Sequence, residues 1–591
     1  MLSKIKQTIT NCSENLKFRF SPSRQHLTEN WLQQGYQHHQ LGEYAAAEKC
    51  YKDILALNAK SVDAHYLLGR LYGQQGQYES AVSLLEKAIA LKPNFADAYA
   101  DLGNVYQLLD QPNRAESYYA RAIFLDDGHL LAHYNLGLLC QEKKQLDLAE
   151  SSFHRVLQLQ PNFIDAYKAL VRILVEQDKF NEAKTLAQQA IQNNPNSAKA
   201  HACMGFVLQK MDQAGDALAY YQQALEIEPQ NYEILDNMGI VLRDMGRMDE
   251  AIAIFDQAIA LKPDYPLARW HKAFVYLARG DFEQAWPDYD LRLLSQDRPQ
   301  RNFPYPRWKG TSLSGRTMLI YAEQGIGDEI MFASCLPDVI TRAGHCVIEC
   351  ASKLAPLFKR SFPTATVHGG SQTDTTDWLS QLPSIDLQIP IGSLPPLLRK
   401  KTEDFPRHQG YLHADAERVA YWRERLDTLG AGLKVGISWR GGTKISRTAL
   451  RSIPLTKWLP ILQQQNRHFI NLQYDEVDQE LTDLLNQHGI TVHNWQEAIV
   501  DYDETAALVT ALDMTVSVCT ALIHLGGALG RPVWIMAPFS PEWRYGRTGE
   551  AMPWYPSVRI FRQTAAGVWD NVVDNVAQEL LQLAGNKENN G

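Results

Sequence analysis

Residues 96–129 read ADAYADLGNVYQLLDQPNRAESYYARAIFLDDGH, and the same pattern returns every 34 residues through the first half of the chain. Alanine keeps this step at Ala47, Ala81, Ala115, Ala149, Ala183, Ala217, Ala251 and Ala285. Glycine keeps it at Gly35, Gly69, Gly103, Gly137, Gly205 and Gly239, while Val171 and Ala273 fill the two remaining positions. A unit of this length holds two short antiparallel helices, which small side chains allow to cross closely. Since one unit cannot bury its own apolar face, the pattern predicts a stacked α-solenoid.

These repeats resemble the tetratricopeptide repeat family, and the match covers eight registers. We therefore predict a lead-in over residues 1–27 and eight repeats over 28–295. In the last register Trp286, Pro287 and Tyr289 replace the usual tail. This change is expected where a terminal unit packs against the next domain.

The second half of the chain changes to α/β patterning. A connector rich in Pro, Gly and aromatic residues spans 296–316, and the apolar run at Thr317–Tyr321 leads into a glycine-containing loop and a helical segment. Further strands are expected at 345–350 and 364–367. A second set begins at Leu433 and continues with strands at 468–473, 514–518 and 532–537. The order predicts two Rossmann-like lobes, at 317–410 and 433–591, joined by an inter-lobe segment at 411–432, with a closing helix at the C-terminal end.

Two stretches of this half, YAEQGIGDEIMFASCLP and HLGGALGRPVWIMAPFSPEWRYG, resemble the family 9 (heptosyltransferase-like) glycosyltransferases. With the repeats in front, the chain is similar to a group of bacterial proteins that includes flagellin-modifying glycosyltransferases. The resemblance implies a GT-B fold, a nucleotide-sugar donor and metal-independent, inverting transfer. It also places Asp328 as the base that deprotonates the acceptor hydroxyl, which is a suitable task for a positioned carboxylate. The alternative is that Asp328 only caps the helix that follows it.

Two further loops are predicted to bind the donor. After the strand that starts at Leu433 come Arg440, Gly441, Gly442 and Lys444, where glycines let the backbone approach a phosphate and the cations neutralise it. Thr520 and His524 begin a helix after an apolar strand, and helix N-termini bind phosphate. In the family an acid and a glycine stand where this chain has Cys519 and Ala521. A buried core histidine is the alternative for His524.

At the cleft between the lobes we place Gln324, Trp543, Arg544 and Tyr545 as donor or acceptor contacts. An aromatic side chain there could stack on the base of the donor or close the cleft by packing. No D-x-D motif and no cluster of metal ligands stands out in the sequence, so we expect no metal and no cofactor.

The composition and charge of the chain argue against nucleic acid as a partner and against a membrane-spanning segment. The net charge of −9 with no long basic run argues against nucleic acid. The apolar segment at 514–530 is interrupted by polar residues and reads as a buried strand and helix rather than a membrane span. The N-terminal residues lack the apolar core of a secretion signal, and eight scattered cysteines fit reduced thiols in the cytoplasm.

The sequence therefore predicts a cytoplasmic glycosyltransferase that moves a sugar from a nucleotide donor to a Ser or Thr hydroxyl. The acceptor is a protein recruited by the repeats, with flagellin as the specific expectation from the resemblance. Two alternatives stay open. One is an interaction scaffold with a degenerate catalytic half, which the changes at Cys519 and Ala521 favour. The other is a lipopolysaccharide-directed, heptosyltransferase-like enzyme.

Overall fold

The computed structural model describes residues 25–294, 301, 303–370, 374–382, 384–442 and 448–588. The chain divides into two compact units, Met1–Val241 and Leu242–Gly591. The division falls inside a repeat helix, so the last repeats belong to the same compact unit as the two β-sheets.

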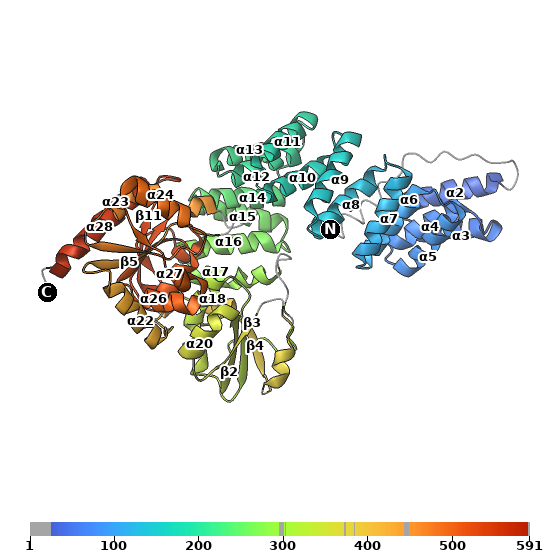
Figure 1. The fold of residues 1–591 in the computed structure, drawn as a ribbon. Helices are drawn as coiled ribbons and strands as arrows, with labels where there is room; N and C mark the ends of the chain where they lie inside the picture. Colours follow the sequence, from blue (N-terminus) through green and yellow to red (C-terminus); the bar gives the residue numbers. More distant parts are fainter. Residues whose placement is uncertain are drawn as a thin grey trace. The chain divides into compact units, whose positions relative to one another are not determined.

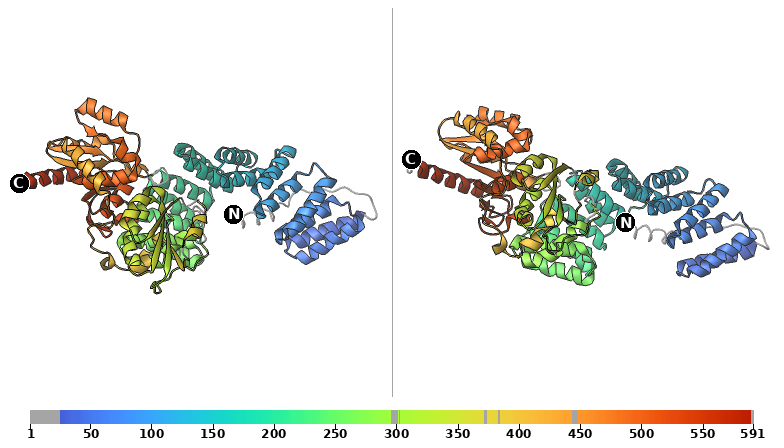
Figure 2. Two further views of the ribbon diagram at one scale, coloured as in Figure 1. Left: turned by 60° about the horizontal axis from the view of Figure 1, so that its bottom comes forward. Right: turned by 90° about the horizontal axis from the view of Figure 1, so that it is seen from below.

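The described part of the N-terminal region consists of eight helix pairs, which Figures 1 and 2 show in sequence order within each unit. Their bounds are α2 (Gln25–Gln40), α3 (Tyr44–Leu57), α4 (Val62–Gln74), α5 (Tyr78–Leu91), α6 (Ala96–Leu108), α7 (Pro112–Leu125), α8 (Leu130–Glu142), α9 (Leu146–Leu159), α10 (Ile164–Glu176), α11 (Phe180–Asn193), α12 (Ala198–Lys210), α13 (Ala214–Ile227), α14 (Tyr232–Asp244), α15 (Met248–Leu261), α16 (Pro266–Arg279) and α17 (Phe282–Tyr289). The periodic alanines of the second helices, from Ala47 to Ala285, are fully buried. The solenoid prediction is confirmed.

Five of the periodic glycines, Gly35, Gly69, Gly103, Gly137 and Gly205, pack against the second helix of the same repeat. A methyl group on Gly103 would lie 2.7 Å from the ring of Tyr119, and one on Gly137 would lie 2.8 Å from the ring of Phe153. Only a residue without a side chain permits such an approach, because contacts below about 3 Å between carbon atoms are strongly repulsive.

The last repeat is embedded in the core of the second unit. Trp286 and Tyr289 of α17 are buried, and the indole N–H of Trp286 donates to the carbonyl oxygen of Arg399 at 2.6 Å. A 3-10 helix, η1 (Asp290–Leu294), follows and carries the fully buried Arg292.

The first sheet has the strand order β3-β2-β1-β4 and is parallel throughout. Its strands are β1 (Thr317–Tyr321), β2 (His345–Ala351), β3 (Thr366–Gly370) and β4 (Leu387–Pro390). Between them lie α18 (Ile326–Phe332), η2 (Ala333–Cys335), α19 (Leu336–Ile340), η3 (Ser352–Leu354), α20 (Ala355–Ser361) and η4 (Asp377–Gln381). After β4 come η5 (Ile391–Ser393), α21 (Pro395–Leu398) and η6 (Thr402–Asp404), and α22 (Ala416–Asp427) leads to the second sheet.

The second sheet has the order β10-β11-β9-β8-β5-β6-β7, and its pairs are parallel except for β10 with β11. Its strands are β5 (Leu433–Ser438), β6 (Arg467–Asn471), β7 (Val492–His493), β8 (Met514–Val518), β9 (Val533–Ala537), β10 (Ala551–Met552) and β11 (Tyr555–Arg562). Helices between them are η8 (Thr448–Arg451), η9 (Leu455–Trp458), α23 (Leu459–Leu462), α24 (Asp478–His488), α25 (Gln496–Val500), α26 (Tyr502–Ala511), α27 (Ala521–Ala528) and η10 (Trp543–Tyr545), and α28 (Asp570–Glu588) follows. The strands expected near 317, 345, 364, 433, 468, 514 and 532 are all present, within three residues.

The chain order defines a switch point in each sheet. It runs outward from β1 through β2 and β3 and then returns to β4 on the other side of β1. It likewise runs from β5 through β6 and β7 and returns to β8. Crevices at such points, outside the carboxyl ends of the strands, are where ligands bind in parallel α/β sheets. No helix in the described ranges is long and apolar enough to span a bilayer.

Candidate active site

The predicted site loops lie at the carboxyl ends of the central strands. Gln324 and Asp328 follow β1, Arg440 to Gly442 follow β5, and Thr520 follows β8. The helices that start at β1 and β8 touch, since a methyl group on Gly327 of α18 would lie 3.1 Å from Cδ2 of His524 in α27. The two switch points therefore meet around these helices.

Asp328 is held by an arginine that lies far from it in the C-terminal half of the sequence. Nε of Arg544 lies 2.7 Å from Oδ1 of Asp328, and the Nη2 group of Arg544 contacts the same oxygen. The second oxygen, Oδ2, accepts no hydrogen bond from any described residue. The N-cap of α18 is Gly325, not Asp328. Burial raises the pKa of the Asp328 carboxyl, although Arg544 acts to lower it.

The ion pair continues into a chain of charges. Arg544 also contacts Glu542, and Nη1 of Arg451 donates to Oε1 of Glu542 at 2.7 Å. Burial would raise the pKa of Glu542, but Arg544 and Arg451 outweigh it and lower the pKa. The alternation of carboxylates and guanidiniums fixes the loop after β9 against the start of α18.

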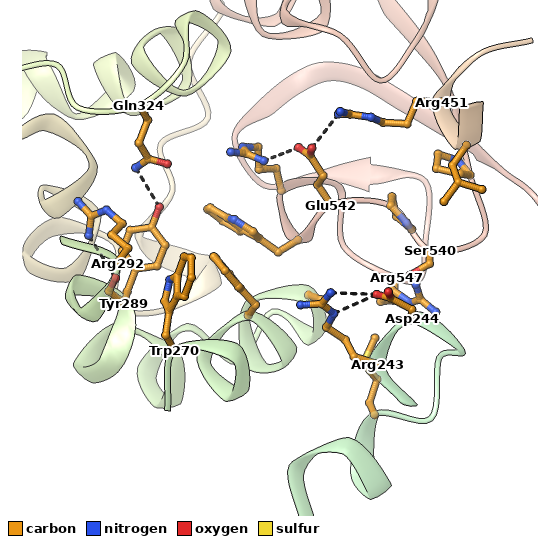
Figure 3. Close-up of a pocket in the computed structure, with 18 residues that line it drawn as sticks. Arg243, Asp244, Trp270, Tyr289, Arg292, Gln324, Arg451, Ser540, Glu542 and Arg547 are labelled. Carbon is orange, nitrogen blue, oxygen red and sulfur yellow. Dashed lines mark hydrogen bonds and ion pairs between the residues drawn. The ribbon is translucent and has the colours of Figure 1, made fainter. Parts of the chain in front are cut away.

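These residues border a pocket with a volume of about 310 Å³, shown in Figure 3. Five arginines line it: Arg243, Arg292, Arg451, Arg544 and Arg547. Four aromatic residues line it as well: Trp270, Phe274, Tyr289 and Trp543. The carboxylates in the lining are Asp244 and Glu542. The lining thus carries a net positive charge, which together with aromatic walls suits an anionic ligand with a ring system.

The structure brings together three of the four predicted cleft residues. Gln324, Trp543 and Arg544 line the pocket, and Gln324 donates from Nε2 to the Tyr289 hydroxyl at 3.3 Å. Tyr545 is buried and is not part of the lining. Asp328 is not part of the lining either, but it contacts Arg544, which is.

The predicted donor loop after β5 is placed differently. The guanidinium of Arg440 contacts Glu480, and its Nε lies 3.5 Å from Oδ2 of Asp475, so its charge is already compensated. A methyl group on Gly441 would lie 2.7 Å from the carbonyl oxygen of Cys519, which packs this loop against the start of α27. Gly442 has φ +83°, a conformation that favours glycine. Lys444 lies outside the described residues.

At the start of α27 the two predicted residues differ in exposure. Thr520 is the N-cap and is partly exposed. His524 is buried, with Nδ1 3.2 Å from the Tyr555 hydroxyl and Nε2 3.4 Å from the Tyr545 hydroxyl. Burial, assisted by Arg544, lowers the pKa of His524 to about 3, so the ring is neutral. A neutral ring between two phenols packs the core, and a donor-binding role for His524 stays a prediction.

Sequence reasoning missed the repeat side of the pocket. Arg243, Trp270 and Phe274 come from α14 and α16, where nothing in a repeat pattern distinguishes them from ordinary surface positions. Glu542 could have been found, since it stands two residues before Arg544 in a segment already selected. Within the described ranges, no group of three or more His, Cys, Asp or Glu side chains is arranged to hold a metal ion.

Comparisons with known proteins bear on the first half of the chain. Family models described as tetratricopeptide repeat match residues 28–61, 50–83, 196–264 and 237–302, and one described as TPR repeat matches 69–110. A model of the cilia and flagella-associated protein 70 middle TPR-like domain matches residues 99–217. The N-terminal region consists of tetratricopeptide repeats. Such repeats typically bind protein partners.

Among curated proteins, the chain is similar to protein FlbA of Caulobacter vibrioides, with 33% identity over 337 residues. The match covers 54% of this chain and 56% of FlbA, so the chain spans about half the length of this relative. Among solved structures, MamA is 25% identical with a TM-score of 0.27, covering 29% of this chain and 94% of MamA. Yeast Tom70 is 18% identical with a TM-score of 0.38, covering 50% of this chain and 66% of Tom70.

Proposed function

We propose that this protein is a glycosyltransferase of GT-B type that transfers a sugar from a nucleotide donor to a hydroxyl of a protein bound by its repeats. One observation carries the proposal. The loops after β1, β5 and β9 border a single pocket, whose lining has five guanidinium groups and four aromatic rings. Each sheet has a switch point among its parallel strands, and nucleotides commonly bind at such points in open α/β sheets.

The geometry supports a direct displacement. The acceptor hydroxyl attacks the anomeric carbon, its proton passes to Oδ2 of Asp328, and the bond from that carbon to the nucleotide phosphate breaks. Arg544 fixes Oδ1, and no described residue donates to Oδ2, so the carboxylate is oriented while one oxygen keeps its capacity to accept a proton. A carboxyl whose pKa is raised by burial is a stronger base than one in water. Guanidinium groups of the pocket compensate the charge of the departing nucleotide.

Flagellin is the acceptor we propose to test first. Flagellin co-expressed with the protein in a host that supplies nucleotide sugars should gain the mass of one or more sugars, measured by intact-mass spectrometry. Asp328→Asn should remove this gain while the protein still folds, because Asn cannot accept the proton. Asp570→Asn, at an exposed carboxylate paired with Lys457, is the matched control and should leave the gain intact.

The alternatives predict different results. A mass gain that survives in Asp328→Asn would assign the base elsewhere. A wild-type protein that adds no sugar to flagellin but glycosylates a lipopolysaccharide core would be a glycan-directed enzyme. If no acceptor is modified and no nucleotide raises the melting temperature, the C-terminal half is a scaffold, since a ligand specific for the folded state must stabilise it.

A further inference from the structure

One end of the pocket is built by the repeats and by the loop after β9. Figure 3 shows Arg243, Asp244, Ser540 and Arg547 gathered there, away from the end where Tyr289, Arg292 and Gln324 lie. The guanidinium of Arg547 reaches back to the turn after α14, where a methyl group on Gly246 would lie 2.7 Å from its Nη2. This close approach places a side chain of the last loop against the seventh repeat.

Arg547 differs from the other arginines of the pocket in making no direct contact with a carboxylate of the described residues, although Asp244 lies near enough to attract it. Each of the other four binds a carboxylate, in the pairs Arg243–Asp244, Arg292–Glu323, Arg451–Glu542 and Arg544–Asp328. Among the residues that the structure describes, Arg547 forms neither a hydrogen bond nor an ion pair. Asp244 is engaged by Nε and Nη2 of Arg243, at 3.2 and 2.9 Å, so two guanidinium groups share one carboxylate and this end keeps one positive charge in excess.

The Arg547 guanidinium is partly removed from water without gaining a hydrogen-bond acceptor, which is energetically unfavourable. The side chain is half-buried, and its guanidinium carbon lies 5.4 Å from the centroid of the Phe539 ring. Burial lowers the pKa of Arg547, the nearby Asp244 acts to raise it, and Arg243 adds to the lowering. A cation that gives up water without gaining an acceptor destabilises the fold, and such groups persist where a ligand supplies the acceptor.

We propose that the Arg547 end of the pocket is an anion site, which binds a phosphate or carboxylate group of a substrate through the free edge of the guanidinium. The planar guanidinium can donate two parallel hydrogen bonds to such a group, while Phe539 packs against it. The inference deepens the proposed function and rests on it in treating the pocket as the substrate site. Two sources supply this chemistry: the phosphates of the donor, and an acidic side chain next to the acceptor hydroxyl.

The test measures binding rather than sugar transfer, so its failure is separate from failure of the proposed function. The full chain is titrated by calorimetry with three probes. They are inorganic pyrophosphate, a serine peptide that carries two glutamates, and the same peptide with both glutamates replaced by glutamines. Arg547→Gln should weaken binding of pyrophosphate or of the acidic peptide at least tenfold. Arg547→Lys should give an intermediate loss, because lysine keeps the positive charge but cannot donate two parallel hydrogen bonds. Arg423→Gln, at an exposed arginine of α22, is the matched control and should bind as wild type.

Stability provides the second readout. Without ligand, Arg547→Gln should melt no lower than wild type, because it removes a positive charge in excess. Loss of pyrophosphate binding assigns the site to the donor phosphates, and loss of acidic-peptide binding assigns it to the acceptor. The proposal is overturned if wild type binds none of the probes, if Arg547→Gln binds all of them as wild type does, or if the folded Arg547→Lys variant binds them no better than Arg547→Gln.

Discussion

The guanidinium of Arg544 grips a single oxygen of the Asp328 carboxylate, with Nε 2.7 Å from Oδ1. The two residues are 216 positions apart in sequence, and both side chains are largely buried, 15% and 14% exposed. The contact joins the start of α18, after the first sheet, to the loop that follows β9 of the second. It also orients the carboxylate that we propose as the base.

Replacing Arg544 should therefore affect chemistry and folding together. Arg544→Met leaves Asp328 and Glu542 buried without their shared partner, and we expect a loss of roughly 3 kcal/mol in the free energy of unfolding. Sugar transfer should fall by about 100-fold or more, because Oδ2 is no longer held in position. Arg544→Lys should recover part of the stability but not the orientation. Arg425→Met, at a more exposed pair with Glu497, is the control and should change each quantity little.

Glu329, the neighbour of Asp328, predicts a pH dependence of stability. Its carboxylate is 3% exposed and accepts the N–H of Ala351 at 2.8 Å. Burial raises its pKa from 4.5 to about 7. Because the folded state binds this proton more tightly than the unfolded state, Glu329 destabilises the fold progressively as pH rises from 4.5 to 7. Above pH 7 the destabilisation is complete, at about 3 kcal/mol as an upper limit.

Glu329→Gln removes the charge and keeps an oxygen for the Ala351 N–H. We expect the variant to melt higher than wild type at pH 8 and equally at pH 4, measured by circular dichroism. Glu424→Gln, at an exposed position of α22, should show no such pH-dependent difference. An equal gain for Glu329→Gln at both pH values would mean that packing, not ionisation, is responsible.

Arg292 should be the residue on which the β1–α18 loop depends most. It is 1% exposed and donates from Nη2 to Oε1 of Glu323 at 2.8 Å and to Oγ of Ser393 at 2.9 Å. Removing one partner of a buried ion pair leaves the other charge uncompensated, so Arg292→Met should lower the unfolding free energy by roughly 3–5 kcal/mol. Arg279→Met, at a pair with Asp249 in which Arg279 is 39% exposed, should lower it by about 1 kcal/mol or less. Similar losses for both variants would contradict this explanation.

Features set by residues close together in the sequence could be predicted, and contacts between residues far apart in the sequence could not. The repeats, the strands and the loops at the strand ends were predictable, because a 34-residue period or a short run of apolar residues indicates each of them. The Asp328–Arg544 pair was not, although both residues were selected, because no local pattern relates positions 216 apart. The pocket residues Arg243 and Trp270 carried no signal either, since a repeat tolerates any polar or aromatic residue on its surface.

The repeat period also contains a pairwise rule that single positions do not show. Five of the six periodic glycines face the residue sixteen positions later, as in Gly69 with Leu85, Gly137 with Phe153 and Gly205 with Tyr221. Where valine replaces the glycine, at Val171, the residue sixteen positions later is the buried Ala187. The two helices of a repeat thus share one volume, filled from either side.

This rule predicts that the volume can be exchanged. Gly137→Val alone should overpack against Phe153 and lower the unfolding free energy by roughly 1–3 kcal/mol, and Phe153→Ala alone should open a cavity and lower it by roughly 3–5 kcal/mol. In the double variant the valine fills the space of the lost ring, so the combined loss should fall short of the sum by about 1 kcal/mol or more, measured by denaturant unfolding. Gly215→Val supplies the control, because a methyl group there meets no atom within 4 Å. Additive losses would show instead that the glycine is required by the helix backbone and not by the volume opposite it.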